Sequence, residues 1–266
     1  MSIVVSLLSR MTAGRKGQEI LARIASRCEW LMGIGCGGSV GASGERAIFD
    51  ELERRAAQPL CIFDVGANRG QFLELARRRL DGKQFGIHCF EPGAVAFDEL
   101  RRLAGSDSRV IHVRAALGRR PGEGRLFFDR PGSQLASLHK RRLEHKQLPF
   151  DLSEQVRIDT VDDYCRAQGI TRIDLMKIDV EGHELEVLAG AQRMLRDRAI
   201  GIVTFEFGGC NIDSRTYFRD FYYLFRDAGM NIFRITPRGY LYPVESYKEE
   251  HEQFRTTNFM AVEPRA

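Results

Sequence analysis

Asp64, Gly66 and Gly70 form the pattern D-x-G-x-x-x-G within the stretch "IFDVGANRGQF", residues 62–72. An apolar run ends in the acid, and a helical pattern begins after the second glycine. A glycine at position 66 lets the chain turn and lets a ligand approach the backbone. The start of a helix also presents free N–H groups, which suit a carboxylate or a phosphate. The pattern therefore predicts a ligand-binding turn between a buried strand and a helix.

Glu91 ends the next apolar run, in "CFEP", 21 positions after Gly70. A carboxylate at this position can accept hydrogen bonds from both hydroxyls of a ribose. Parallel strands would bring it to the same sheet edge as the glycine turn. Together these residues predict a nucleoside-containing ligand at the carboxyl ends of the strands. The alternative is an ordinary strand-to-helix turn with a surface glutamate.

NAD and S-adenosylmethionine both match this outline, and the spacing favours the latter. A dinucleotide site has glycine at the first and third positions of its turn, so that two phosphates can sit close to the backbone. Here the first position is Asp64, and the turn is longer. Its charge would repel a pyrophosphate but would attract the ammonium group of a methionine, directly or through water.

A second glycine pattern, G-x-G-x-x-G, is formed by Gly33, Gly35 and Gly38. A dinucleotide site needs a buried strand before this pattern and a helix directly after it. The helical-looking "SRCEWLM" precedes it here, and more glycine follows. We therefore predict a flexible linker over residues 33–44.

Asp179 ends the apolar run "LMKID", which reads as the fourth strand of a sheet. Strand alternation places its side chain on the same side as those of Leu175 and Lys177. A carboxylate at the end of a buried strand is costly unless it has a task. Asp179 is therefore predicted to be catalytic, at the same sheet edge as Asp64, whereas Lys177 could simply pair with an acid.

Other candidate catalytic groups follow at once: Glu181, His183 and Glu184 come next in the chain, and Glu206 ends the fifth strand in "TFEF". His183 is a candidate base because histidine titrates near neutrality, although it could equally be a surface residue. Glu181 and Glu184 could instead be favourable charges at a helix N-terminus. The acids could also hold Mg²⁺, but no spacing requires a metal, and we expect none.

The elements that must position these groups alternate between strand and helix from residue 60 onwards. The predicted strands are "LCIFDV", "FGIHCFE", "RVIHVRAAL", "RIDLMKID" and "GIVTFEF". The predicted helices are 69–80, "AVAFDELRRLA", 160–168, 183–196 and 214–227. Three further runs, "NIFRIT", "GYLYPV" and "NFMAVE", suggest antiparallel strands that close one edge. This alternation predicts a mostly parallel sheet with helices on both faces.

Two parts are expected along the chain: an N-terminal helical extension with a glycine-rich linker over 1–45, and one α/β domain over 46–266. Residues 1–32 read as an amphipathic helix, and 45–57 as the first helix of the domain. The apolar start is too short to span a bilayer, and its basic residues follow the apolar stretch, which is the wrong order for a secretory signal. Contact of this end with a membrane surface or a partner remains an alternative.

Residues 118–158 interrupt the alternation, with "GRLFFD" and "EQVRID" as short strands. Within them, residues 130–150 are predicted to form a lid over the second substrate, the acceptor, because long loops inside compact domains are usually functional or disordered. The candidate acceptor contacts in this lid are Ser133, Ser137 and His139, and its basic residues are Lys140, Arg141, Arg142 and Lys146. The basic group could meet an anionic acceptor or form a solvated face. Tyr240 and Tyr242 could stack on a sugar or pack at the sheet edge.

The composition is that of an ordinary globular protein, and it indicates neither a nucleic-acid-binding protein nor a disulfide-rich one. Of the 266 residues, 43% are hydrophobic and 29% are charged, which is ordinary for a globular chain. The 40 basic and 36 acidic residues leave a net charge of +4, too small to predict nucleic-acid binding. The six cysteines are scattered without a C-x-x-C pair, so we expect reduced thiols and a cytoplasmic location.

At this point the sequence resembles the FkbM-type methyltransferases, which use S-adenosylmethionine. The matching blocks cover roughly residues 60–262 in the order of the family. They are "FDVGANRGQF", "HCFEPGAVAFDEL", "VRAALGRRPGEGRLFF", "VRIDTVDDY", "IDLMKIDVEGHELEVLAGA" and "IVTFEF". The block "KIDVEGHE" is the most specific of them.

The resemblance implies a class I methyltransferase fold, a seven-stranded Rossmann-like sheet whose last strand is reversed. It implies that Asp64, Gly66, Asn68 and Gly70 line the methionine end of the cofactor and that Glu91 lines its ribose. Many class I enzymes place an acid or amide near the adenine after the third strand. Here that stretch reads "RAALG", so no adenine contact is predicted.

The predicted function is transfer of a methyl group from S-adenosylmethionine to a hydroxyl of a sugar, a glycan or glycolipid, or a secondary metabolite. In this interpretation Asp179, His183, Glu181 and Glu206 are catalytic, and Ser137, His139 and Glu184 bind the acceptor. The alternatives are a non-catalytic binding module on the same scaffold, an RNA methyltransferase and a nicotinamide-dependent oxidoreductase. The sequence does not predict the oligomeric state.

Overall fold

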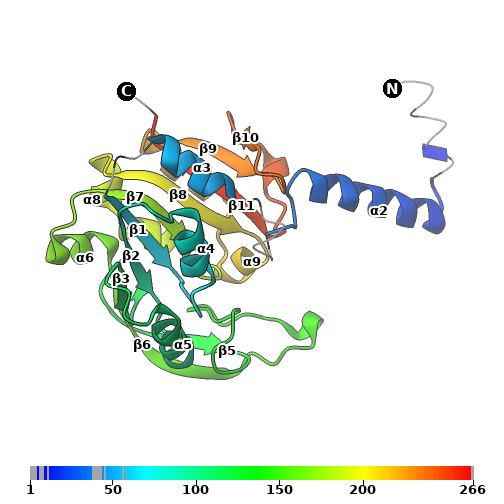
Figure 1. The fold of residues 1–266 in the computed structure, drawn as a ribbon. Helices are drawn as coiled ribbons and strands as arrows, with labels where there is room; N and C mark the ends of the chain where they lie inside the picture. The colour runs from blue at the N-terminus through cyan, green and yellow to red at the C-terminus, as the bar shows by residue number, and fades with distance from the viewer. Residues whose placement is uncertain are drawn as a thin grey trace.

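The computed structural model of the chain describes residues 5, 9–10, 12–37, 44, 46–55, 57 and 59–264. Its centre is an eight-stranded sheet in the order β10-β9-β11-β8-β7-β1-β2-β3 (Figure 1). Five of these strands run parallel: β1 (Leu60–Val65), β2 (Phe85–Phe90), β3 (Val110–Val113), β7 (Ile173–Ile178) and β8 (Ile200–Phe207). Their near-continuous burial reflects their apolar sequences and the cover on both faces. The predicted mostly parallel sheet is confirmed.

The closing edge is antiparallel, as the sequence predicts. β11 (Thr257–Val262) runs antiparallel to both β8 and β9 (Asn231–Ile235) and lies between them. The short strand β10 (Leu241–Pro243) then pairs with β9 at the outer edge. This added edge strand makes the sheet eight-stranded rather than seven-stranded, while the reversed strand β11 occupies the predicted place.

Helices cover both faces of the sheet and enclose two separate apolar cores. One core packs α3 (Arg46–Arg55), α4 (Gln71–Arg79) and α5 (Ala94–Ala104) on the first face. The other packs α6 (Val161–Gln168), α7 (Glu184–Ala189), α8 (Gln192–Arg196) and α10 (Phe218–Asp227) on the second face. Leu175 lies in the first core and Met176 in the second, which confirms the predicted alternation along β7.

A second sheet of three strands accounts for the interruption of the repeating pattern. β4 (Ala116–Leu117) runs parallel to β6 (Leu152–Asp159), and β5 (Gly122–Phe128) runs antiparallel to β6. The predicted short strands "GRLFFD" and "EQVRID" are these strands β5 and β6. The predicted third strand "RVIHVRAAL" is divided, because β3 joins the large sheet and β4 joins the small one. Between β5 and β6 the chain forms a long loop with one 3₁₀ turn, η1 (Glu144–Lys146).

The predicted helix over 183–196 is two helices, α7 and α8, because the chain breaks at Gly190. A Cβ at Gly190 would lie 2.1 Å from the Gly118 carbonyl oxygen, so this glycine lets the helix pass close to the backbone of the small sheet. The predicted helix over 214–227 is α10, preceded by the short helix α9 (Cys210–Ser214), which the sequence pattern did not indicate. The second 3₁₀ turn, η2 (Glu249–His251), precedes β11.

The N-terminal helix α2 (Arg15–Leu31) projects away from the domain (Figure 1). The predicted linker after it is only partly a linker. Gly33, Ile34, Cys36 and Gly37 are buried against the domain, and a Cβ at Gly33 would lie 2.4 Å from the Ile235 carbonyl oxygen. Residues 38–43, which include Gly38, lie outside the described residues.

Candidate active site

A cavity of about 530 Å³ opens at the carboxyl edge of the large sheet. The strand order reverses between β1 and β7, because β2 and β3 lie on one side of β1 and β8 lies on the far side of β7. Ligands of open α/β sheets bind at such a switch point. The cavity wall includes the ends of β1, β2, β7 and β8, together with the loop that follows β5.

The glycine turn after β1 forms the floor of this cavity. Gly66 has a φ of +82°, and a Cβ there would lie 1.9 Å from the Asp179 carbonyl oxygen. Asn68 also adopts a left-handed conformation, with a φ of 46°, and its side-chain amide donates to the Ser133 carbonyl oxygen at 3.2 Å. Gly66 and Asn68 line the cavity, whereas Gly70 does not: it is the N-cap of α4, and a Cβ there would lie 2.4 Å from Leu103 Cδ2.

The N–H groups of residues 66–70 are all hydrogen-bonded within the protein. Those of Gly66 and Ala67 donate to the Phe90 carbonyl oxygen, and that of Gly70 to Ala67. Those of Asn68 and Arg69 donate to side-chain oxygens. The turn itself therefore offers a ligand no free N–H group at these five residues, because their N–H groups fix its shape. The free donors predicted for the start of the helix stay a prediction for the residues that follow Gly70.

A Gly66→Ala variant is expected to lose at least about 2 kcal/mol of unfolding free energy, since a Cβ would add both a backbone clash and left-handed strain. Urea unfolding monitored by circular dichroism measures this loss. Gly82→Ala is the matched control, because Gly82 has a φ of +73° with nothing within 4 Å of a Cβ. Equal losses in the two variants would show that close packing at Gly66 is unimportant.

Asp64 lies fully buried behind Lys177. The Lys177 ammonium is 3.3 Å from Asp64 Oδ1 and 3.3 Å from Asp179 Oδ2, so it bridges the two acids. Burial raises the pKa of Asp64, and the Lys177 charge opposes that rise. Lys177 and Asp179 line the cavity, but Asp64 does not. Asp64 thus acts on the cavity by positioning Lys177.

Glu91 lines the cavity where β2 ends. Its Oε2 accepts from the Asn68 N–H at 2.9 Å, and its Oε1 accepts from the Gly93 N–H at 2.7 Å. Burial raises the pKa of Glu91 to about 7, although both backbone donors favour the charged form. Each carboxylate oxygen can still accept a second hydrogen bond.

Beside Glu91, the cavity has an apolar end. Its wall there is formed by Phe90, Ala115, Ala116, Leu117 and Leu126. Three of these side chains belong to "RAALG", the stretch in which no polar adenine contact could be predicted. Where many class I enzymes have an acid or amide, this cavity therefore has an apolar surface, which suits a flat ring.

The opposite end is acidic, with Asp179, Glu181 and Glu206 on the wall. Burial and then the charge of Asp179 raise the pKa of Glu181 to about 7 and the pKa of Glu206 well above its ordinary range. The Asp179 side chain is the most open of these acids, with 39% of its surface exposed. Among the described residues, no group of three or more His, Cys, Asp and Glu side chains is arranged to hold a metal ion.

Arg141 fixes the long loop after β5 against this acidic end. Its guanidinium, only 4% exposed, pairs with Glu181 at 2.5 Å and with Asp213 at 3.4 Å. Ser137 adds a second tie, since its hydroxyl donates to the Glu181 carbonyl oxygen at 2.7 Å and accepts from the His139 N–H. Arg141 and Ser137 line the cavity, so the predicted lid forms part of the wall. Lys140 and Arg142 make exposed ion pairs with Asp151 and Glu144.

His183 and His139 meet on the same side of the cavity. His183 Nδ1 lies 3.2 Å from His139 Nε2, and His183 Nε2 lies over Gly118. Burial and the neighbouring His139 lower the pKa of His183 to about 4, so its ring is neutral at pH 7. His183 lines the cavity, whereas His139 is not among its lining residues. Tyr240 and Tyr242 are exposed near the sheet edge, where Tyr242 stacks with Arg234.

Glu184 does not line the cavity but supports the turn that carries Glu181. Its Oε1 accepts from the N–H groups of Val180 and Gly182, which fixes the turn that presents Glu181. Its Oε2 is buried with no hydrogen-bond partner in the described part of the chain. Burial raises the pKa of Glu184 to about 7.

These buried acids predict an inverted pH dependence of stability. Glu91, Glu181 and Glu184 have folded pKa values of about 7 against ordinary values of 4.5, so the folded chain binds more protons between these limits. The stability that these three acids contribute is therefore expected to fall as pH rises from about 5 to 7, by at most about 1.4 kcal/mol per pH unit for each group. His88 and His183, whose pKa values burial lowers to about 4, contribute in the opposite direction up to about pH 6.5.

Urea unfolding between pH 5 and 8 tests this expectation. Glu184→Gln should flatten the slope, because the amide cannot titrate, whereas Glu74→Gln, an exposed residue on α4, should leave the slope unchanged. A slope that Glu184→Gln leaves the same as in the wild type would contradict the raised pKa of Glu184.

Gly37 is a cavity residue that sequence reasoning missed. Its N–H donates to the Thr256 carbonyl oxygen at 3.1 Å, and a Cβ there would lie 3.2 Å from Glu206 Oε1. The only signal was the run of glycines, which we interpreted as a linker. The segment after α2 thus reaches the acidic end of the cavity.

The family model described as the methyltransferase FkbM domain matches residues 64–232. The chain is 30% identical over 156 residues to "31-O-demethyl-FK506 methyltransferase FkbM" of Streptomyces tacrolimicus, a match that covers 49% of this chain and 59% of the relative. It is 29% identical over 150 residues to "2-O-methyltransferase NoeI" of Sinorhizobium fredii, covering 50% and 58%.

A third relative is "Hexuronic acid methyltransferase AglP" of Haloferax volcanii, 25% identical over 166 residues that cover 62% of this chain and 64% of the relative. The matches thus span less than two thirds of these relatives. Among solved structures, methyltransferase FkbM from Methylobacillus flagellatus aligns with a TM-score of 0.49 and 17% identity, covering 78% of this chain and 44% of that one.

Proposed function

We propose that this chain, which belongs to the FkbM methyltransferase family, transfers a methyl group from S-adenosylmethionine to a hydroxyl oxygen of a sugar, a glycan or glycolipid, or a secondary metabolite. The single observation that supports it best is the two-ended cavity at the switch point of the sheet. Its apolar end beside Glu91 suits a nucleoside, and its acidic end suits the positive charges of a sulfonium and an ammonium group.

In this proposal Glu91 holds the ribose hydroxyls, and "RAALG" packs against the adenine. Gly66 and Asn68 shape the turn under the methionine part. Lys177, held by Asp64 and Asp179, is the cation of the cavity wall nearest to this turn and suits the methionine carboxylate.

The bound cofactor would supply an activated methyl group on its sulfonium, so the protein mainly has to orient the acceptor oxygen. Orientation of this kind can contribute roughly 7–11 kcal/mol.

Asp179 is the group that we assign to remove the acceptor proton. Its Oδ2 pairs with Lys177, which leaves Oδ1 to accept a hydrogen bond from a hydroxyl in the cavity. Glu206 is less suited to this role, because burial raises its pKa well above the ordinary range and so disfavours the charged form that a base needs. Glu181 is engaged by Arg141, and His183 Nδ1 faces His139 Nε2, while burial lowers the pKa of His183 to about 4. These three groups, with Ser137, His139 and Glu184, are therefore assigned to shaping the acceptor end.

The acceptor class is supported by the names of two relatives, a 2-O-methyltransferase and a hexuronic acid methyltransferase. A cytoplasmic location is supported by the six cysteines, all of which are free thiols in the described residues. Among the described residues, no helix is long and apolar enough to cross a bilayer. We further propose that residues 46–266 form the catalytic domain.

Transfer of a labelled methyl group into fractionated cell extract tests this function. Label is expected in the carbohydrate, glycolipid or small-molecule fractions, and mass spectrometry of the product then gives the methylated position. Label in RNA alone would overturn the acceptor class. Thermal stabilisation by NAD(H) and not by S-adenosylhomocysteine would favour an oxidoreductase, and stabilisation by neither would favour a non-catalytic module.

A further inference from the structure

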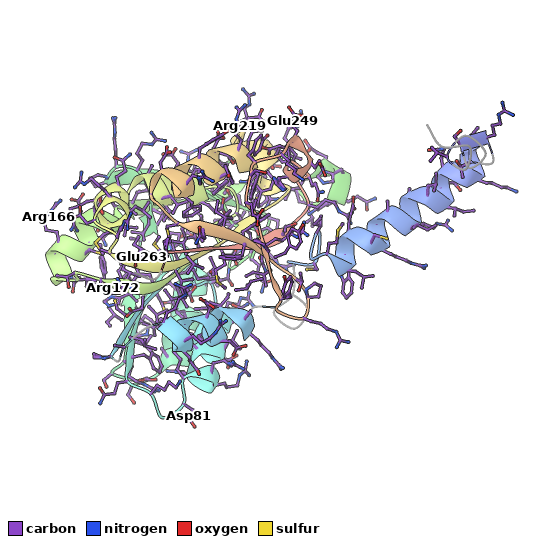
Figure 2. The ribbon with its side chains drawn as sticks, turned by 90° about the horizontal axis from the view of Figure 1, so that it is seen from above. Asp81, Arg166, Arg172, Arg219, Glu249 and Glu263 are labelled. Carbon is purple, nitrogen blue, oxygen red and sulfur yellow. The ribbon has the colours of Figure 1, made fainter. Side chains whose placement is uncertain are left out.

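Helix α2 carries a continuous apolar face that no part of the described chain covers. None of its residues is buried. Ile20, Ile24 and Leu31 recur at spacings of four and seven, so they share one face, and they are 55%, 51% and 68% exposed. Leu21 and Cys28 lie beside them on the same face and are also exposed. Figure 2 shows the helix extending away from the domain into open space.

Basic residues border this apolar face along one side. Lys16, Arg23 and Arg27 recur at spacings of seven and four, which places them next to the line of Ile20 and Ile24. All three are exposed. The remaining charges lie elsewhere: Arg15 and Glu19 pair on the opposite side, and Glu29 pairs with Arg255 of the domain. An exposed apolar face with a positive border is the pattern of helices that lie in a membrane interface.

We propose that α2 binds the surface of a membrane that contains anionic lipids. The apolar face would enter the boundary between headgroups and acyl chains, and the three basic residues would contact anionic headgroups. At 17 residues the helix is about 26 Å long, so it lies along the surface rather than spanning it.

A second copy of the chain suits this face less well. Two such helices packed antiparallel on their apolar faces would bring their basic borders together, and like charges at that distance repel. The helix also offers only two heptads of apolar residues, Leu21, Ile24, Cys28 and Leu31, which is short for a stable coiled coil. The charge pattern therefore favours anionic lipid over a second copy.

The last turns of the helix bond to the domain next to its active-site end. Arg255 pairs with Glu29 and donates to the Ser26 hydroxyl at 3.3 Å, so the last turns of α2 are fixed in direction. The segment that follows packs on the domain and brings Gly37 to the cavity wall, six positions after the helix ends. Docking of α2 would thus hold the cavity close to the membrane surface.

Sedimentation of the full chain with vesicles tests the proposal without measuring methyl transfer. The vesicles are phosphatidylcholine alone or phosphatidylcholine with one third phosphatidylglycerol. We expect binding to the anionic vesicles that weakens as salt rises. Ile24→Glu should weaken binding at least tenfold, and Arg23→Gln with Arg27→Gln should weaken it about thirtyfold. Ala22→Glu is the matched control on the opposite face and should bind like the wild type.

Three results would overturn the proposal. The first is absence of binding to the anionic vesicles at low salt. The second is binding that Ile24→Glu and Ala22→Glu reduce equally, which would mean that the face plays no part. The third is a concentration-dependent dimer in sedimentation equilibrium that Ile24→Glu dissociates, which would assign the face to a second copy. Since no vesicle result depends on catalysis, the proposal can fail while the proposed function stands.

Discussion

An Asp179→Asn variant is expected to bind S-adenosylhomocysteine within about threefold of the wild type and to transfer methyl groups about 10²- to 10⁴-fold more slowly. Asparagine keeps the size and one acceptor oxygen of the side chain, but it cannot take up a proton at pH 7. The ion pair between Lys177 and Asp64 remains in this variant and should preserve the cavity wall. Isothermal titration measures the binding, and single-turnover transfer measures the chemical step.

Asp81→Asn is the control for this substitution, because Asp81 is exposed in the turn after α4, outside the cavity (Figure 2). It should change neither quantity. Transfer by Asp179→Asn at more than a third of the wild-type rate would remove Asp179 from the role of base. A more than tenfold loss of cofactor affinity at an unchanged rate would instead assign it to binding.

The main sheet could be predicted from the sequence because each parallel strand is a short apolar run followed by an amphipathic helix. Such runs have few other ways to bury both faces. The acids at 64, 91, 179 and 206 could be located for the same reason, since each directly ends or follows a strand. The carboxyl ends of parallel strands meet at one edge of the sheet. A residue at the end of such a strand in the sequence can therefore be assigned to that edge.

The relations between side chains within the site could not be predicted in this way. Lys177 turns toward both Asp64 and Asp179, which removes Asp64 from the cavity wall. Arg141 is drawn inward by Glu181 and Asp213, although the sequence around it reads as a solvated basic segment. These outcomes depend on which opposite charge lies nearest after folding, and hydrophobic periodicity contains no such information.

The packing of glycines was also beyond a sequence interpretation. Gly37 and Gly190 look like linker or helix residues, yet each sits where a side chain would meet another part of the backbone. Glycine is compatible with both a flexible segment and a close approach. Only the tertiary contact separates the two, and at Gly37 that contact brings the segment after α2 into the active site.

A Glu91→Ala variant is expected to weaken binding of S-adenosylhomocysteine by more than tenfold. Hydrogen bonds to a charged group contribute about 1.5–3 kcal/mol each, and the ribose would lose its two. The loss has a second cause, because the Asn68 and Gly93 N–H groups would lose their acceptor and the turn under the cofactor would lose its fixed shape. Isothermal titration of the full chain measures the affinity, and circular dichroism verifies that the variant is folded.

Glu154→Ala is the matched control for Glu91→Ala. Glu154 also accepts from a backbone N–H at the start of α5, that of Ala94 at 3.2 Å, but it does not line the cavity. Its removal should leave the affinity within about threefold of the wild type, because it costs one cap of α5 and no ligand contact. If the two variants lose affinity equally, the effect of Glu91 comes from supporting α5. If Glu91→Ala binds like the wild type, the ribose lies elsewhere and the cofactor crosses the cavity in another direction.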